Sequence, residues 1–528
     1  MSKIVLILSR SFKTFLLRTG HNKALVFLLS FSIYLATLGA PFFNLEASAF
    51  IPAKQLLQKT LSKTELQEKL HKLFSSKEAK DIFWGVKIVD IEDGQDIFNL
   101  NQDKQFRPAS NMKIVIASAA LKALSTEFRF ETKLFIDGVI NKGVLKGNLV
   151  VVGSGDPTFR TENLGEWYAV LKSHGIRKIT GNIVGIDTIF DDKRMGLLWS
   201  WKDISNCYSA QVSGLQINGN CVEVLVTPSK RNRPPIVKKI PETSYVRVYN
   251  NAKTNGINSS LGFSRQPQTN NIVVSGHIKS SIKELRRWVS VDNPTLYFLT
   301  LFYEGMKKNN IQVLGRILDA RDTGYTLNHA KTTMLTSHKS APLRLIISDF
   351  LKHSINLYGE SILKTLGFVY FNDGTTYNGR LAVNLILKQF GLPEKNLFIA
   401  DGSGLSVLNL MSPNYITSLL NGISKTYQYG TFVNSLSKSG MDGTLSARLN
   451  TNYMRGAVHA KTGYLSTARS LSGYIDTMGN KRLAFAVFAN NFKNNLNKAE
   501  SIIDKACTLM RFYAPKEQKT DIALISAH

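Results

Sequence analysis

Ser110 and Lys113 have the residue types and the spacing for nucleophilic catalysis. An apolar run extends from this pair to Leu124 and Pro108 precedes it, so the sequence predicts a helix that begins near Ser110. Positions i and i+3 share one face of a helix, which brings the serine hydroxyl and the lysine amine together. A neutral lysine can take the hydroxyl proton, and a helix N-terminus favours the negative charge that then develops.

A serine followed three residues later by a lysine is a weak signal by itself. The same spacing occurs at Ser435 and Lys438. The alternative for Ser110 and Lys113 is a structural serine in the first turn of a helix, followed by a solvated lysine.

A second motif, Lys461-Thr462-Gly463, lies in a segment with the composition of a β-strand, residues 459–465. A strand that presents lysine and threonine at a cleft can bind an extended peptide with a terminal carboxylate. Glycine in such a strand lets the substrate backbone approach closely. The alternative is an edge strand with a solubilising lysine.

A third pair, Ser354 and Asn356, lies between these motifs at the end of a predicted helix. The serine can relay a proton, and the asparagine can hold a lysine or a substrate amide. The alternative is local capping of the helix. A similar Ser-x-Asn tripeptide, Ser412-Pro413-Asn414, shows that this pattern is common.

Together and in this order, the three motifs resemble the set found in β-lactamases and penicillin-binding proteins. The chain is similar to the class C low-molecular-mass penicillin-binding proteins, the D-alanyl-D-alanine carboxypeptidase/endopeptidase family, over about residues 73–513. The long segment between Lys113 and Ser354 is typical of that family, whereas Ile355 replaces its commoner aspartate. Further matching segments are Gly155-Asp156-Pro157, Asp401–Ser406, Asp442–Leu445 and Lys461–Tyr474.

The resemblance implies catalytic roles for five residues. Ser110 attacks the carbonyl of the penultimate D-Ala of a peptidoglycan stem peptide, and Lys113 takes its proton. Ser354 passes a proton to the leaving amine, and Asn356 holds the network. Lys461 keeps the field positive, which favours a neutral Lys113. Water then hydrolyses the acyl-enzyme.

The resemblance also implies how substrate is bound. Thr462 hydrogen-bonds the terminal carboxylate with help from Lys461, and Gly463 belongs to the same binding strand. The backbone N–H groups of Ser110 and Tyr464 form the oxyanion hole. No metal or organic cofactor is implied, and β-lactams are expected to acylate Ser110 as covalent inhibitors.

The elements around these motifs predict an α+β fold, because helices precede and follow an antiparallel sheet. The resemblance implies a transpeptidase domain of the penicillin-binding and β-lactamase type, with helices on both sides of that sheet. Short β-rich pieces between residues 128 and 321 predict an insertion of one or two subdomains, in which Pro228–Gln268 is expected to be mostly surface loop. The predicted divisions are a signal peptide at 1–49, the peptidase domain at 50–127 and 322–515, the insertion at 128–321 and a polar tail at 516–528.

The first 49 residues have the order of a secretory signal. A basic leader ends at Lys23, an apolar run covers residues 24–40, and Ala47-Ser48-Ala49 provides a small-residue cleavage site. The apolar run is short for a membrane span, so an uncleaved anchor is the alternative. We therefore expect the protein to act outside the cytoplasm, in the periplasm or the cell wall.

The formal net charge of +28 at pH 7 points to anionic partners. Outside the cytoplasm these are wall polymers and lipid headgroups, which would give a peripheral membrane contact. The alternative is a solvated basic surface with no single partner. The leader, and the lack of basic motifs interleaved with aromatic residues, argue against nucleic acid.

The chain has three cysteines, Cys207, Cys221 and Cys507. The first two can pair in an oxidising compartment or remain thiols, and the sequence leaves this open. Cys507 is expected as a buried thiol on the last helix. No Cys/His spacing matches a metal site.

Two other functions compete with the peptidase. A β-lactamase on the same scaffold needs a group that activates the deacylating water; no extra carboxylate motif is evident, and the long insertion argues against it. A catalytically silent wall-binding protein would not need Ser110, Lys113, Ser354, Asn356 and Lys461 together. Carboxypeptidase and endopeptidase action remain alternatives, because both cleave after D-Ala at a D,D bond.

Overall fold

The computed structural model describes residues 60–493 and 496–515. The predicted signal peptide, 1–49, and the predicted tail, 516–528, lie outside the described residues. Over the residues that are described, no helix is long and apolar enough to cross a membrane.

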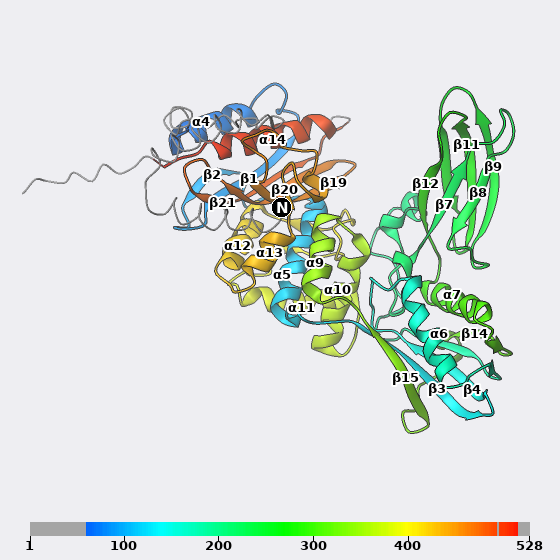
Figure 1. The fold of residues 1–528 in the computed structure, drawn as a ribbon. Coiled ribbons are helices and arrows are strands. Elements are labelled where there is room, and N and C mark those ends of the chain that lie inside the picture. Colours follow the sequence, from blue (N-terminus) through cyan, green and yellow to red (C-terminus); the bar gives the residue numbers. More distant parts are fainter. Residues whose placement is uncertain (1–59, 494–495, 516–528) are drawn as a thin grey trace, which may run out of the picture. The chain divides into compact units, whose positions relative to one another are not determined.

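A six-stranded antiparallel sheet forms the centre of the peptidase domain within the described residues, with the order β18-β19-β20-β21-β1-β2. Figure 1 shows that its strands come from the two ends of the described chain, coloured blue and orange. The predicted hairpins at 83–100 and 470–489 are both present. The strand bounds are β1 Phe83–Asp90, β2 Asp96–Leu100, β18 Ser437–Lys438, β19 Val458–Leu465, β20 Ala468–Asp476 and β21 Arg482–Asn490.

Helices cover both faces of this sheet, as predicted. Alternation along β21 directs Phe485 and Val487 to one core, and Ala486 and Phe488 to the other. The first core is closed by α4 (Lys63–Phe74) and α14 (Leu496–Arg511). The second is closed by α5 Met112–Leu124, α9 Leu343–Lys352, α10 Asn356–Phe371, α11 Thr376–Lys388, α12 Pro413–Ser424 and α13 Tyr429–Ser435.

Helix α5 carries Lys113 in its first turn and is buried along almost its whole length. Its sequence, MKIVIASAALKAL, is apolar on nearly every side, which is the pattern of a helix inside a core rather than on a surface. A short 3-10 turn, Ala109–Asn111, precedes it and holds Ser110. The central helix therefore fixes both residues of the first motif.

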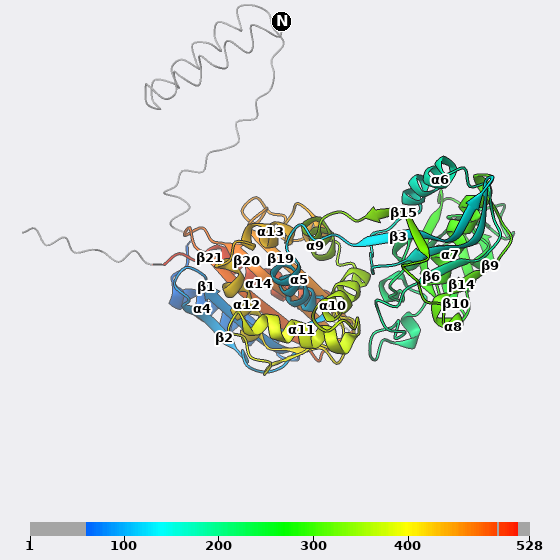
Figure 2. The same ribbon diagram turned by 90° about the horizontal axis from the view of Figure 1, so that it is seen from below.

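The inserted region contains a mixed seven-stranded sheet, counted over the described chain, and its own apolar core around Trp167 and Phe298. Figure 2 shows this region, coloured teal to green. Helices α6 (Leu164–Ser173) and α7 (Pro294–Lys308) pack on the sheet. α8 (Ala320–Thr323) is one short turn. The strand bounds are β3 Glu131–Asn141, β4 Val144–Val152, β5 Lys178–Ile179, β6 Ile183–Ile186, β13 Gln312–Val313, β14 Ile317–Asp319 and β15 Thr332–Lys339.

Strand β15 corrects the predicted end of the insertion at residue 321. It pairs antiparallel with β3 and so belongs to the inserted sheet, although it follows the predicted boundary. β15 lies at the end of this sheet, and its sequence, TTMLTSHK, has no residue that is fully buried. A polar edge strand of this kind lacks the apolar run that marks a buried strand.

The prediction that Pro228–Gln268 is mostly surface loop was wrong. This segment forms three strands, β8 (Ile236–Ile240), β9 (Arg247–Asn255) and β10 (Ser260–Arg265). Exposed and half-buried positions alternate along them, so lysine, asparagine and serine occupy the solvent side of small sheets. β8 pairs with β7 (Cys221–Thr227), which also pairs with β12 (Leu285–Ser290). β9 and β10 both pair with β11 (Asn271–Lys279).

The cysteine pairing that the sequence left open is settled by the structure. Cys207 and Cys221 form a disulfide across a sequence separation of 14 residues. Cys507 is a buried free thiol on α14, as expected.

We expect the Cys207→Ser/Cys221→Ser variant to lose about 3 kcal/mol of unfolding free energy, the loop-entropy contribution of a disulfide that closes so short a loop. Urea denaturation followed by circular dichroism measures the change. Dithiothreitol should lower the midpoint of the wild-type protein and leave that of the variant unchanged. Equal midpoints for variant and wild type would contradict the prediction.

Candidate active site

Ser110 lies in a turn held in a strained conformation. The preceding residue, Ala109, has φ 49°, in the left-handed region that alanine rarely adopts. Gly404 packs directly on this turn, because a Cβ at Gly404 would come within 1.9 Å of the Ala109 carbonyl oxygen. The strain and the close contact together place the half-buried Ser110 at the first turn of the central helix, where backbone N–H groups have no intrahelical partner.

Lys113 is fully buried, and each hydrogen of its ammonium has an acceptor. Nζ donates to Ser110 Oγ at 2.9 Å, to Asn356 Oδ1 at 2.7 Å and to the Ser403 carbonyl oxygen at 2.5 Å. The structure therefore brings together the first motif, one residue of the third motif and the Asp401–Ser406 segment.

Burial lowers the pKa of Lys113 to about 7, against an ordinary value of 10.5. Desolvation is the main cause, and the nearby carboxylates Asp401 and Glu360 oppose it. A lysine whose pKa lies near 7 is neutral in a substantial fraction of molecules at neutral pH. It can then accept the proton of the Ser110 hydroxyl.

Asn356 and Ser354 have different environments. Asn356 is the first residue of α10; its Oδ1 accepts from Lys113, and its Nδ2 donates to the Tyr208 carbonyl oxygen at 2.7 Å. Ser354 lies in the left-handed turn between α9 and α10, with φ 58°. In the described part of the chain its half-buried hydroxyl makes no hydrogen bond. Its role in proton transfer remains a prediction.

Lys461 is buried on β19, and desolvation followed by the charge of Lys113 depresses its pKa well below the ordinary value. Two neighbouring buried amines disfavour carrying a positive charge at the same time. This coupling keeps a neutral amine available beside Ser110. The Asn111 side chain links the two elements by donating to the Lys461 carbonyl oxygen at 3.1 Å.

Thr462 is held by the Asp442–Leu445 segment. Its hydroxyl donates to Thr444 Oγ1 at 2.8 Å. Asp442 in turn pairs with Lys352 Nζ at 2.7 Å, which ties the segment to α9. This arrangement fixes the position of the Thr462 hydroxyl on β19.

Gly463 and Tyr464 complete the predicted strand. A Cβ at Gly463 would lie 2.1 Å from Ser470 Oγ and 2.8 Å from the Pro108 carbonyl oxygen. Glycine is thus required for β19 to approach the turn before Ser110. The Tyr464 side chain is directed elsewhere and donates to Glu500 at 2.8 Å, so its predicted role rests on its backbone N–H alone.

The buried carboxylate of Glu360 behind Lys113 was not predicted from the sequence. Glu360 accepts from the backbone N–H groups of Gly402 and Ser403 at 3.1 and 2.8 Å, and so aims the Ser403 carbonyl at Lys113. Burial, reinforced by Asp401, raises the pKa of Glu360 to about 7. The signal in the sequence was a pair of charged residues, Glu360 and Lys364, inside the largely apolar segment 357–371.

Asp401 organises the glycine-rich segment that follows it. It accepts from Gly404 N at 2.7 Å, Ser406 N at 2.6 Å and Asn409 Nδ2 at 2.7 Å. A fourth donor, Trp199 Nε1 at 2.8 Å, comes from the inserted region. These contacts hold the segment in place between Lys113 and the inserted region.

These contacts bring a serine hydroxyl and the amine of a buried lysine together on an α+β scaffold. No group of histidine, cysteine, aspartate and glutamate side chains in the described chain has the arrangement of a metal site. The chemistry available here is acyl transfer through Ser110.

Comparison with known proteins supports that class. The model of the D-Ala-D-Ala carboxypeptidase 3 (S13) family matches residues 66–510. A D-alanyl-D-alanine carboxypeptidase from an Actinomadura species is 30% identical over 440 residues, 81% of each chain. The D-alanyl-D-alanine carboxypeptidase DacB of Haemophilus influenzae is 29% identical over 409 residues, 76% of this chain and 84% of that protein.

The crystal structure of penicillin-binding protein 4 (DacB) from Haemophilus influenzae has the same fold. Its TM-score is 0.73 at 26% identity, and the match covers 88% of this chain and 100% of that chain. The chain therefore belongs to the D-Ala-D-Ala carboxypeptidase 3 family, which confirms the resemblance stated from its motifs. It is a serine-type D-Ala-D-Ala carboxypeptidase.

We expect kcat/KM for a D-Ala-D-Ala peptide to rise with pH through an ionisation at about 7. Lys113 must be neutral to act as base, and its pKa is lowered to about 7, so the protonated, inactive form predominates below that pH. Initial rates across pH 5 to about 9 measure the profile. A rate that is independent of pH over this interval would contradict the assignment.

Glu360→Gln separates the two groups that titrate in this range. Removing a carboxylate that raises the pKa of Lys113 should move the ionisation in kcat/KM to lower pH. If the ionisation belonged to Glu360 itself, it would disappear in the variant. Circular dichroism at each pH provides the control for folding.

Proposed function

We propose that this carboxypeptidase cleaves the D-Ala-D-Ala end of peptidoglycan stem peptides through an acyl-enzyme on Ser110. The observation that carries the proposal is the 2.9 Å contact between Ser110 Oγ and the Nζ of a lysine whose pKa lies near 7. The same chemistry extends to D-Ala cross-links, which would make the enzyme an endopeptidase as well.

Each proton transfer in this reaction is assigned to a named group of the protein, and each bond change to named atoms. The Ser110 oxygen bonds to the carbonyl carbon of the penultimate D-Ala while Lys113 takes its proton. The backbone N–H groups of Ser110 and Tyr464 stabilise the oxyanion. The C–N bond then breaks, and the leaving amine receives the proton through Ser354 and Lys113. Water, activated by the neutral lysine, hydrolyses the ester and frees Ser110.

We assign the terminal carboxylate of the substrate to residues of β19. Thr462 turns its hydroxyl hydrogen from Thr444 Oγ1 to the carboxylate, and Lys461 offers positive charge once the carboxylate is present. Asp442 and Thr444 support this strand from behind. Asn356, anchored on the Tyr208 carbonyl oxygen, keeps Lys113 directed at Ser110.

β-Lactams fit the same site, because their ring carbonyl mimics the D-Ala-D-Ala amide and Ser110 would remain esterified. The Haemophilus influenzae relative has been solved in complex with a β-lactam, with a TM-score of 0.68 and 24% identity to this chain. Glu360 and Asp401 are both engaged by backbone N–H groups, which leaves neither placed to activate water as a β-lactamase requires.

The proposal includes that the enzyme acts outside the cytoplasm. The leader at 1–49 has the order of an export signal. The Cys207–Cys221 disulfide suits an oxidising compartment. The net charge of +28 suits a protein that works on anionic wall material and contacts membrane surfaces peripherally.

Mass spectrometry of the intact protein with benzylpenicillin tests the acyl-enzyme. We expect a stable gain of one penicilloyl group in the wild-type protein and none in Ser110→Ala. Ser435→Ala is the matched control, because Ser435 has the same spacing to a lysine, and this variant should still be acylated.

Two other results would overturn the proposal. Loss of penicillin without an adduct would indicate a β-lactamase. A folded protein that neither reacts with penicillin nor cleaves a D-Ala-D-Ala peptide would favour the silent wall-binding protein.

A further inference from the structure

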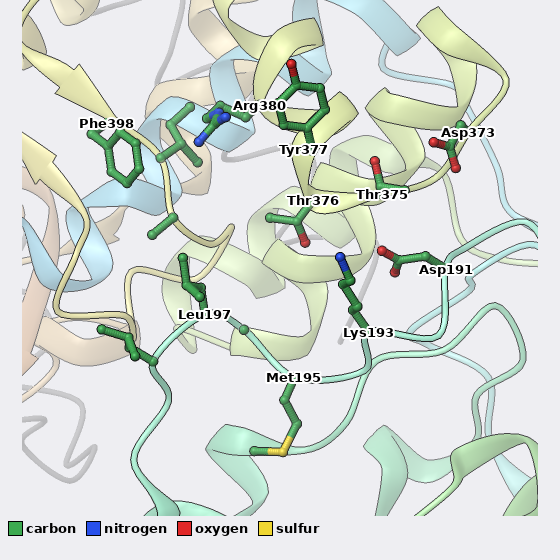
Figure 3. Close-up of a pocket in the computed structure, with 14 residues that line it drawn as sticks. Asp191, Lys193, Met195, Leu197, Asp373, Thr375, Thr376, Tyr377, Arg380 and Phe398 are labelled. Carbon is green, nitrogen blue, oxygen red and sulfur yellow. The ribbon is translucent and has the colours of Figure 1, made fainter.

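A pocket lies beside Ala400, the residue just before the Asp401–Ser406 segment. It is formed between residues 191–198 of the inserted region and the first half of α11, with a volume of about 600 Å³. Figure 3 shows the inserted segment along one side and α11 with Phe398 along the other. This volume is ordinary for a small-ligand site.

The cations of this pocket are free to bind a ligand. The Arg380 guanidinium is half-buried and lies 5.3 Å from the Tyr377 ring centroid and 5.4 Å from that of Phe398. In the described chain, no hydrogen bond or ion pair occupies the Arg380 guanidinium or the Lys193 ammonium. The two rings hold the guanidinium in place while its N–H donors stay available.

The acids of the pocket are already engaged. Asp191 binds the ammonium of Lys364, a buried residue of α10. Asp373 accepts from Asn378 Nδ2 at 2.8 Å. The side-chain groups that remain available are therefore the hydrogen-bond donors of Arg380 and Lys193, together with the hydroxyls of Thr376 and Tyr377. A set of donors of this kind favours the binding of a carboxylate.

The pocket and the active site border the same short segment of the chain. Ala400 lines the pocket, and Ser403, three residues further on, contacts Lys113 through its carbonyl oxygen. Three residues span at most about 11 Å. Asp401 and Ser403 are buried, so a substrate that reaches both sites passes over this segment.

We propose that Arg380 and Lys193 bind an internal carboxylate of the peptidoglycan substrate, remote from the scissile bond. This inference rests on the proposed function, since it concerns a second part of the same substrate. Arg380 offers a planar pair of N–H donors that matches a carboxylate, and Lys193 adds a second positive charge from the inserted region. The exposed apolar residues Leu197 and Leu198 flank the backbone or sugar on either side of the carboxylate.

The test compares two substrates that differ only in this charge. One is a disaccharide pentapeptide with free internal carboxylates, and the other is the same molecule with those groups converted to carboxamides; both keep the terminal carboxylate. The kcat/KM of the wild-type enzyme should be about tenfold higher for the free acid, mainly because KM is lower. A tenfold difference corresponds to the usual contribution of one charged hydrogen bond. In Arg380→Gln this ratio should fall to about one, and Lys193→Gln should reduce it in the same direction.

Lys388→Gln is the matched control, because it removes one positive charge from the exposed side of the same helix and should retain the wild-type ratio. Arg380→Lys keeps the charge without the planar donor pair and should recover part of the preference. A wild-type enzyme that cleaves both substrates equally, or an Arg380→Gln variant that keeps the preference, would overturn this inference. Cleavage of neither substrate by the wild-type enzyme would instead overturn the proposed function.

Discussion

The burial of one lysine ammonium imposes the main constraint on this structure. A charge removed from water is tolerated only where every donor has a partner. Lys113 meets that demand through Ser110, Asn356 and the Ser403 carbonyl, which come from three separate parts of the chain. A displacement of any of these parts would leave the ammonium with an unpaired donor, so its burial locks together the central helix, α10 and the Asp401–Ser406 segment.

The carboxylates behind this lysine set the balance of its protonation. Desolvation alone would drive Lys113 far toward the neutral form, and Glu360 with Asp401 would alone favour the charged form. The two effects meet at a pKa of about 7, where one group can both accept and return a proton. Neither carboxylate touches the nucleophile, since both are engaged by the backbone of the segment whose carbonyl faces Lys113.

The sequence predicted the parts of the site that depend on local geometry. Ser110 and Lys113 share a helix face whatever the rest of the chain does, and Lys461 belongs to a strand with a clear apolar pattern. The bond from Lys113 to Ser403 spans 290 residues, and the one from Asn356 to Tyr208 spans 148. No local pattern encodes such contacts, so the supporting carbonyls could not be predicted.

The fold shows the same division between local and long-range signals. The central sheet and its helices followed from apolar periodicity, because both sides of each element are buried. The strands within Pro228–Gln268, and β15, were missed because one side of each faces solvent and polar residues fill it. Pairing with a distant strand, such as β15 with β3, stabilises them where composition does not.

The inserted region contacts the elements that surround Lys113. Its Tyr208 carbonyl orients Asn356, and its Trp199 indole binds Asp401, so it contacts two of the elements that surround Lys113. The Cys207–Cys221 disulfide lies next to Tyr208 and restrains the turn that presents this carbonyl. Asp191 of the inserted region binds the buried Lys364 of α10 and so fixes its own segment on that helix. Lys113 and Asn356 are far apart in the sequence but in direct contact, and Tyr208 of the insertion holds Asn356 in that position.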